Sequence, residues 1–241
     1  MSIFNGVALV TGAASVDRDA DKLGDTEVTI KETFQGVQVL AVPTDISKEE
    51  DIENLYSETI KALGRVDYVV NGAGVLSNNK RSHESSIEEF DVINNVNYRG
   101  CWLSSRAAIK CMLKQDPLPT HDGRPGARGS IVNIASQLGV VGRPAAPAYC
   151  GSKAAVISMT RCDAIDYSKD LIRVNAVCPG LIDTAMTRPQ ADVLSPAINI
   201  APMGRMGSPQ EVADCILFLA SSKASFVQGA AMMVDGGYVI N

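Results

Sequence analysis

The sequence predicts an α/β fold built on a doubly wound parallel sheet. Short apolar runs alternate with amphipathic segments along the chain, which is the order of parallel strands joined by crossover helices. The first run, Val7–Val10, ends in Thr11-Gly12, in the way a strand ends at a phosphate-binding turn. At 241 residues, 46% hydrophobic and 20% charged, the chain suits one domain spanning residues 1–241.

Six segments have the length and composition of strands. They are Val7–Val10, Val37–Val42, Val66–Val70, Ser130–Ala135, Ile172–Cys178 and Ala231–Val234. Residues 12–36 are too few for a helix, a strand and a second helix, which take roughly 40 residues. We therefore expect one helix within residues 17–35 and Val37–Val42 directly beside Val7–Val10, the position that a single right-handed crossover reaches.

The clearest helix is Lys48–Leu63. Ser47 and Glu50 have the spacing of a capping box, and Gly64 is a natural stop. One face is apolar and carries Ile52, Leu55, Tyr56, Thr59, Ile60 and Leu63. Pro and Gly crowd Asp116–Gly129, which predicts an exposed loop.

Charge and composition argue against several classes of function. A net charge of -5 gives no basis for binding nucleic acid or an anionic membrane surface. The apolar runs are too short to span a bilayer, and Met1–Asn5 does not resemble a secretory signal. The six cysteines never occur at C-x-x-C spacing, so we expect no metal site and a reduced, cytoplasmic protein.

Residues with chemical potential gather after the later strands. "NGAG" at 71–74 follows one strand, Ser136 follows another, and Tyr149 and Lys153 share one face of a predicted helix. A lysine ammonium beside a phenol favours the phenolate and lowers its pKa, and a serine hydroxyl holds a substrate oxygen. This combination is suited to proton transfer at a carbonyl or alcohol. The alternative is a strand-end hydroxyl, a half-buried aromatic and a surface charge.

In order and spacing these motifs resemble the short-chain dehydrogenase/reductase family over nearly the whole chain. The matching stretches are Thr11-Gly12, "PTDIS" at 43–47, "NGAG" at 71–74, "NVNYRG" at 95–100, "IVNIAS" at 131–136, "YCGSK" at 149–153, "CPGLIDT" at 178–184 and "VDGG" at 234–237. The resemblance implies a Rossmann-like domain that binds NAD or NADP and acts on a small carbonyl or alcohol substrate.

The resemblance also implies roles for individual residues. Tyr149 would be the general acid/base, Lys153 would lower its pKa and hold the nicotinamide ribose, Ser136 would orient substrate, and Asn97 would hold a water. The remaining cofactor contacts would come from Gly12, Asp45, Ile46, Asn71, Gly74, Pro179, Gly180, Ile182 and Thr184. Read without the family, Asn97 is a helix-interior amide and Asp45 a turn residue. The stretch Ala185–Met206 falls where the family has its substrate lid.

The chain departs from the family at its first turn. The family pattern is T-G-x-x-x-G-x-G, whereas this chain continues from T-G-A-A-S into "VDRDADKL" with no further glycine before Gly24. About twenty residues are missing relative to the pattern: two glycines, one helix and most of the second strand. Asp17, Asp19 and Asp21 would repel phosphates there, and Asp17 beside Arg18 leaves the choice between NAD and NADP open.

The sequence thus favours an NAD(P)-dependent oxidoreductase that interconverts a secondary alcohol and a ketone. Two alternatives stay open: a catalytically silent relative that binds or oligomerises, and a dehydratase or isomerase that uses the same tyrosine and serine. The family commonly pairs the helices corresponding to Ile87–Lys114 and Ala148–Ser168 about a two-fold axis, so we expect a homo-dimer or homo-tetramer.

Overall fold

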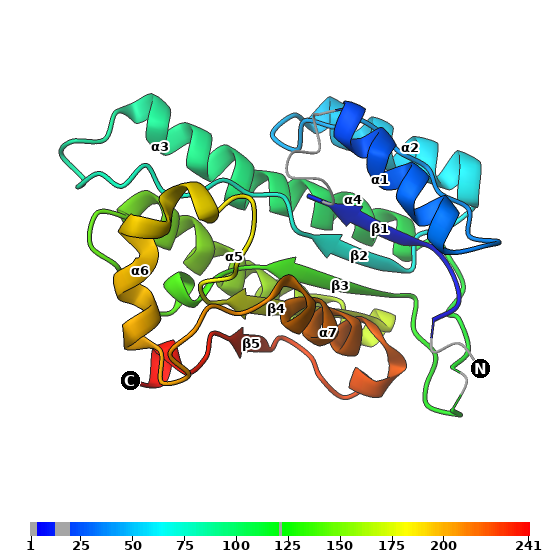
Figure 1. Cartoon of the computed structure of the whole chain (residues 1–241). Coiled ribbons are helices and arrows are strands. Elements are labelled where there is room, and N and C mark those ends of the chain that lie inside the picture. The colour runs from blue at the N-terminus through cyan, green and yellow to red at the C-terminus, as the bar shows by residue number, and fades with distance from the viewer. Residues whose placement is uncertain (1–3, 13–19, 121) are drawn as a thin grey trace.

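The computed structural model describes residues 4–12, 20–120 and 122–241, and their strands form one parallel sheet. Its strands are β1 (Ala8–Thr11), β2 (Tyr68–Asn71), β3 (Gly129–Ile134), β4 (Ile172–Pro179) and β5 (Ala231–Val234). They lie in the order β1-β2-β3-β4-β5, and every neighbouring pair is parallel (Figure 1). Five of the six predicted strands are therefore confirmed to within a few residues.

Helices cover both faces of this sheet, so the doubly wound architecture is confirmed. They are α1 (Ala20–Thr33), α2 (Glu49–Leu63), α3 (Ile87–Asn94), α4 (Cys101–Met112), α5 (Pro147–Asp166), α6 (Ala191–Ile200) and α7 (Pro209–Ala220). On one face, Leu9, Val69 and Ile131 pack with side chains of α2 and α4. On the other, Val132 packs with Leu219 of α7, which lies in front of the lower strands in Figure 1.

The prediction that Val37–Val42 forms a strand beside β1 is wrong. β1 pairs with β2, and residues 37–42 have no regular secondary structure (Figure 1). A strand is stabilised by its ladder of backbone hydrogen bonds, and none joins this segment to β1. Its first residues stay in solvent, with Val37 and Leu40 exposed, and the chain packs against the core only at Val42. The single helix expected within residues 17–35 is confirmed by α1.

Helix α2 has the predicted extent but not the predicted cap. Its N-cap residue is Lys48, whose side chain makes no capping hydrogen bond. The predicted cap residue, Ser47, instead donates its hydroxyl hydrogen to Oδ1 of Asp45, at 2.7 Å. Gly64 ends the helix in the left-handed region, as predicted, and its N–H donates to the Ile60 carbonyl.

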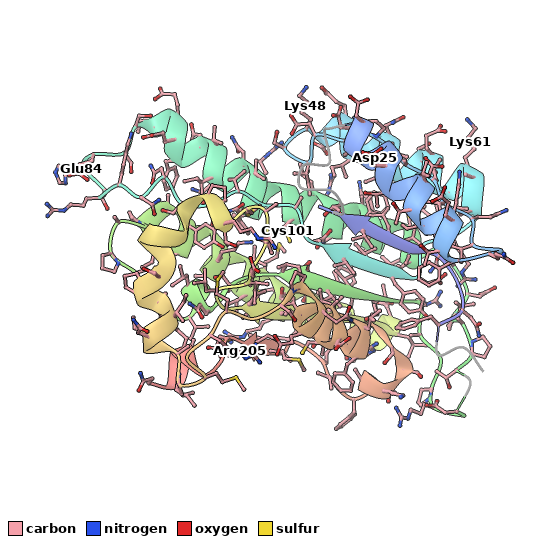
Figure 2. The ribbon with its side chains drawn as sticks, in the orientation of Figure 1. Asp25, Lys48, Lys61, Glu84, Cys101 and Arg205 are labelled. Atoms are coloured by element: carbon pink, nitrogen blue, oxygen red, sulfur yellow. The ribbon has the colours of Figure 1, made fainter. Side chains whose placement is uncertain are left out.

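The parallel order brings the carboxyl ends of all five strands to one edge of the sheet, the edge where α/β folds bind ligands. The arrowheads in Figure 1 point to this edge, where α6 also lies. In Figure 2 Glu84 and Lys61 project outward, while Cys101 lies within the molecule. Within the described part of the chain, the cysteines are unpaired, no helix is long and apolar enough to cross a bilayer, and no cluster of acidic, His and Cys side chains suits a metal.

Candidate active site

Three of the predicted catalytic side chains meet at the edge described above. Ser136 follows β3 and caps a short 3-10 turn, while Tyr149 and Lys153 lie in the first turns of α5. The Ser136 side chain lies beside the Tyr149 phenol and acts to lower its pKa. Lys153 Nζ lies 5.9 Å from the centre of the Tyr149 ring and donates to the Ile134 carbonyl at 2.8 Å.

The electrostatics of this group are dominated by burial. Burial raises the pKa of Tyr149, while Ser136 and the charge of Arg143 act in the opposite direction. Burial also lowers the pKa of Lys153 to about 8. The sequence predicted a phenol whose pKa is lowered by its lysine neighbour, whereas in this structure the net shift is upward and the groups that oppose it are Ser136 and Arg143. Tyr149 is consequently protonated at neutral pH, the form that can give a proton to a ketone oxygen.

Asn97 is held in a π-helical segment, Asn95–Gly100, between α3 and α4. The fully buried amide accepts from the Val75 N–H at 2.8 Å and donates to the Val75 carbonyl at 3.0 Å. It also donates to Ser152 Oγ, at 3.2 Å, one residue before Lys153. A π-bulge is a common feature of functional sites, and here it places the amide between the "NGAG" turn and α5.

Glycines shape the wall beside this group. A Cβ at Gly12, whose φ is +74°, would lie 2.6 Å from the backbone nitrogen of Ala73. A Cβ at Gly74 would lie 3.2 Å from Asn97 Oδ1 and 3.6 Å from Lys153 Nζ. Only glycine fits at Gly12, and a Cβ at Gly74 would be tight, so the carboxyl ends of β1 and β2 present bare backbone to the adjoining cavity.

That cavity has a volume of about 490 Å³ and contains several predicted cofactor residues. Gly12, Asp45, Ile46 and Gly74 line it, together with residues that the sequence analysis did not identify: Thr44, Ser47, Gly72, Ala73, Val75, Leu76, Val92, Asn95, Val96 and Met186. The Asp45 carboxylate accepts from the Ser47 N–H and hydroxyl, so the loop before α2 is fixed where it borders the cavity.

Asn71 does not reach this cavity. Its side chain lies beneath the sheet edge, where Nδ2 donates to Asn133 Oδ1 at 2.8 Å and to Ser105 Oγ at 3.0 Å. Its Oδ1 is buried without a hydrogen-bond partner in the described structure. Asn71 therefore joins β2 to β3 and α4 rather than contacting a ligand in the cavity.

The remaining predicted cofactor residues lie at the end of β4 and in the loop after it, and they do not all line the same cavity. Gly180 lines a small cavity beside Tyr149, whereas Ile182 lines a neighbouring cavity beneath α6. Thr184 is hydrogen bonded to Thr187, and Pro179 ends β4. This loop therefore runs along the catalytic residues, with Met186 at its far end in the 490 Å³ cavity.

The small cavity beside Tyr149 is the substrate-sized space of the site. Its volume is about 90 Å³, and its lining consists of Leu76, Ser77, Ser136, Gln137, Leu138, Arg143, Tyr149, Gly180, Leu181, Thr187, Ala197 and Tyr238. The sequence analysis missed Gln137, Arg143 and Tyr238. The position of Gln137 next to Ser136 was a usable signal, whereas Arg143 and Tyr238 reach the cavity only through the paths of their loops.

The residues present fit both ends of a dinucleotide. The glycine-walled cavity gives an adenosine close access to backbone, and Asp45 and Ile46 border it. Tyr149, Lys153 and Gly180 lie where a nicotinamide end would meet a carbonyl. Residues 13–19, which include Asp17, Arg18 and Asp19 of the shortened loop, lie outside the described residues.

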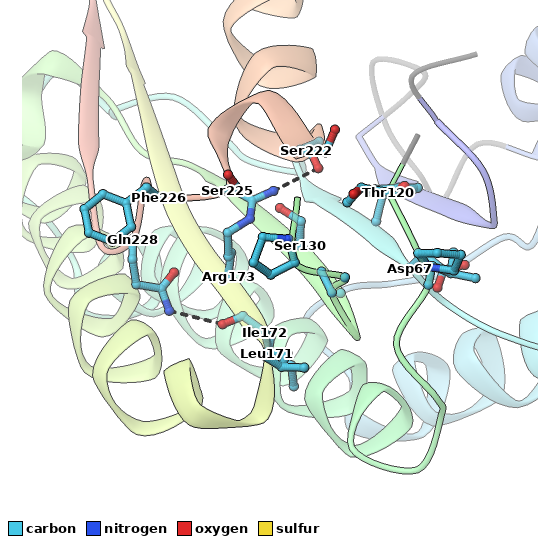
Figure 3. Close-up of a pocket in the computed structure, with 18 of the residues that line it drawn as sticks. Asp67, Thr120, Ser130, Leu171, Ile172, Arg173, Ser222, Ser225, Phe226 and Gln228 are labelled. Carbon is cyan, nitrogen blue, oxygen red and sulfur yellow. Dashed lines mark hydrogen bonds between the residues drawn. The ribbon is translucent and has the colours of Figure 1, made fainter. Parts of the chain in front are cut away.

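A separate cavity of about 350 Å³ lies at the opposite, amino-terminal edge of the sheet (Figure 3). Arg173 of β4 points into this region, and its guanidinium donates to the carbonyls of Leu219, Ala220 and Ser221 at 2.7, 3.1 and 2.9 Å. These carbonyls end α7, so the arginine caps the helix C-terminus. Gln228 likewise donates to the Ile172 carbonyl, at 3.1 Å. The polar groups of this cavity therefore hold the fold together.

Comparisons with known proteins agree with this arrangement. The model of a family described as Enoyl-(Acyl carrier protein) reductase matches residues 11–239. The 2-(R)-hydroxypropyl-CoM dehydrogenase of Xanthobacter autotrophicus is 36% identical in an alignment 246 residues long, gaps included, that covers 97% of this chain and 94% of that protein. The 3-oxoacyl-[acyl-carrier-protein] reductase of Thermotoga maritima is 36% identical over 197 residues, 81% of this chain and 75% of that protein.

Among solved structures, a levodione reductase superposes with a TM-score of 0.85. Its sequence is 28% identical, and the match covers 98% of this chain and 88% of that one. The described strands and helices thus follow those of a known reductase.

Proposed function

Because the chain belongs to the short-chain dehydrogenase/reductase family, we propose that it is an NAD(P)-dependent oxidoreductase that interconverts a secondary alcohol and a ketone, with Tyr149 as general acid/base. The observation that carries this proposal is that Ser136 and Tyr149 line one cavity, with Lys153 Nζ 5.9 Å from the phenol ring. This group borders the 90 Å³ cavity and lies next to the glycine-walled one.

In the reductive direction the nicotinamide, when bound, supplies a hydride to the carbonyl carbon. Ser136 donates a hydrogen bond to the carbonyl oxygen and orients it, and the Tyr149 phenol gives that oxygen its proton. The product is the alcohol, and the tyrosine is left as a phenolate. Lys153 lies close enough to stabilise this anion, and Asn97 fixes the neighbouring Ser152 and the turn at Val75.

One alternative has a specific observation in its favour. A protein of Xanthobacter autotrophicus named Inactive 2-(S)-hydroxypropyl-CoM dehydrogenase 2 is 38% identical over 209 residues, 84% of this chain and 86% of that protein. A protein with this degree of sequence identity to the chain can therefore be named as an inactive dehydrogenase. The second candidate function is a catalytically silent member of the family that keeps the fold for binding.

Titration of the protein with NADH and with NADPH, followed by nucleotide fluorescence, separates the two candidates. An active enzyme binds at least one nucleotide saturably and then oxidises it in the presence of a small ketone. A silent relative gives no oxidation with a broad panel of ketones, whether or not the nucleotide binds. The titration also establishes which of the two nucleotides is the cofactor.

We also propose assembly as a dimer or tetramer through the helices of residues 87–114 and 148–168. Three large side chains on these segments, Trp102, Tyr98 and Ile165, are exposed in the single chain and would be buried by such pairing. Leu103, Ile109 and Met112 instead face the chain's own core. Light scattering at micromolar concentration tests this, and a monomeric mass for the wild type would refute it.

A further inference from the structure

Two polar atoms in the catalytic cavity are buried without a partner. One is Oε1 of Gln137, a side chain only 5% exposed, and the other is Nε of Arg143. Both residues line the 90 Å³ cavity that also contains Ser136 and Tyr149. A buried donor or acceptor without a partner is costly, so the wall formed by these two residues holds polar groups that the described structure does not satisfy.

The guanidinium of Arg143 is held in place by a neutral residue. Its Nη2 donates to Asn79 Oδ1 at 2.6 Å, and Asn79 belongs to the loop that follows the "NGAG" turn. The two loops are also joined through Ser77, whose hydroxyl donates to the Ala145 carbonyl at 3.2 Å. Hydrogen bonds between the loop of Asn79 and the loop of Arg143 therefore fix the position of the arginine beside the cavity.

The charge of Arg143 is not balanced within this cavity. Among the described residues that line it, none is acidic, and the bond that fixes the guanidinium ends on an amide oxygen. The positive charge of Arg143 acts on the Tyr149 phenol, since it opposes the rise in the pKa of that group. A guanidinium that lines a cavity in which its charge is not balanced is best satisfied by an anionic oxygen.

We propose that the substrate is a small oxo acid or hydroxy acid whose carboxylate binds Arg143 while its carbonyl or alcohol oxygen meets Ser136 and Tyr149. This proposal rests on the proposed function, which it narrows to one substrate class. Arg143, Ser136 and Tyr149 line the same cavity, so one small molecule can contact all three side chains. Gln137 offers a second polar contact on the same wall.

The test measures binding rather than turnover, so that it stands apart from the test of the proposed function. Calorimetry compares acetoacetate with 2,4-pentanedione, a neutral ketone of nearly the same shape, on the Tyr149→Phe protein. A charge-assisted hydrogen bond predicts that acetoacetate binds about 10- to 100-fold more tightly. In the Arg143→Met/Tyr149→Phe protein the two ligands should bind equally, and Arg143→Lys should retain part of the preference.

The matched control is Arg106→Met, which removes an arginine that is ion-paired with Glu49 on the outer side of α4. It should leave the preference unchanged, and circular dichroism checks that each variant is folded. The proposal is overturned if neither ligand binds, if both bind equally to the Tyr149→Phe protein, or if Arg143→Met keeps the preference. Failure of NAD(P)H oxidation with a preserved anion preference would instead refute the proposed function alone.

Discussion

The ammonium nitrogen of Lys153 lies 5.9 Å from the centre of the Tyr149 ring, and the lysine is buried while the tyrosine is half-buried. Burial moves the two pKa values apart, raising that of the phenol above its ordinary 10.0 and lowering that of the lysine from 10.5 to about 8. The protonated phenol is thereby favoured over the phenolate, and it is the form that can give a proton to a ketone oxygen.

The pKa of Lys153 predicts a pH dependence of stability. An unfolded lysine has a pKa of about 10.4, so between about pH 8 and pH 10.4 the unfolded chain holds more of this proton than the folded chain does. The contribution of Lys153 to the free energy of unfolding therefore rises with pH in this window. We expect the free energy of unfolding of the wild type minus that of Lys153→Met, measured with urea, to rise by about 2 kcal/mol from pH 7.5 to 9.5. An unchanged difference would contradict the burial argument.

Gly12 should be intolerant of any side chain. Its φ of +74° and the 2.6 Å approach of a Cβ to the Ala73 nitrogen predict that Gly12→Ala lowers the free energy of unfolding by about 1–3 kcal/mol and weakens nucleotide binding. The matched control is Gly24→Ala in α1, where a Cβ meets no atom within 4 Å. That change should stabilise by about 0.5–1 kcal/mol, because alanine favours helix. Equal effects at both positions would argue against the glycine-walled cavity.

Asn97 should matter for stability as well as for the reaction. Replacing it by leucine leaves the Val75 N–H and carbonyl without their partner, at a cost of about 1–3 kcal/mol for each buried group that stays unpaired. Asn94→Leu is the control, since Asn94 is half-buried one turn earlier and its side chain donates only to the Phe90 carbonyl. It should change the unfolding free energy by less than about 0.5 kcal/mol. Similar losses for the two variants would show that the Val75 contacts are unimportant.

Most of the sheet could be predicted because its central strands, β3 and β4, are buried along most of their length and so are largely apolar. Val37–Val42 has a similar composition, yet composition does not reveal whether a partner strand exists, and no backbone hydrogen bond joins this segment to β1. The predicted N-cap of α2 was wrong for a similar reason. Asp45 competes for the Ser47 hydroxyl, and spacing alone does not show which acceptor wins.

The catalytic group was identifiable because Ser136, Tyr149 and Lys153 are set by one strand end and one helix turn. Arg143 was not, because its place depends on a loop in which Ala145 adopts a φ of 56° and on the distant Asn79. The pKa of Tyr149 was also beyond sequence reasoning. Helical spacing brings Lys153 near the phenol, but the depth of burial decides the direction of the shift.

The central claim is that Tyr149 transfers the proton in an NAD(P)H-dependent reduction of a ketone. The most direct measurement is kcat/KM for Tyr149→Phe beside wild type, with nucleotide affinity measured on both proteins. The account predicts a loss of about 10²- to 10⁴-fold in kcat/KM, with nucleotide affinity nearly unchanged, because the phenol supplies the proton and the ring supplies only packing. Turnover by Tyr149→Phe at the wild-type rate would contradict it.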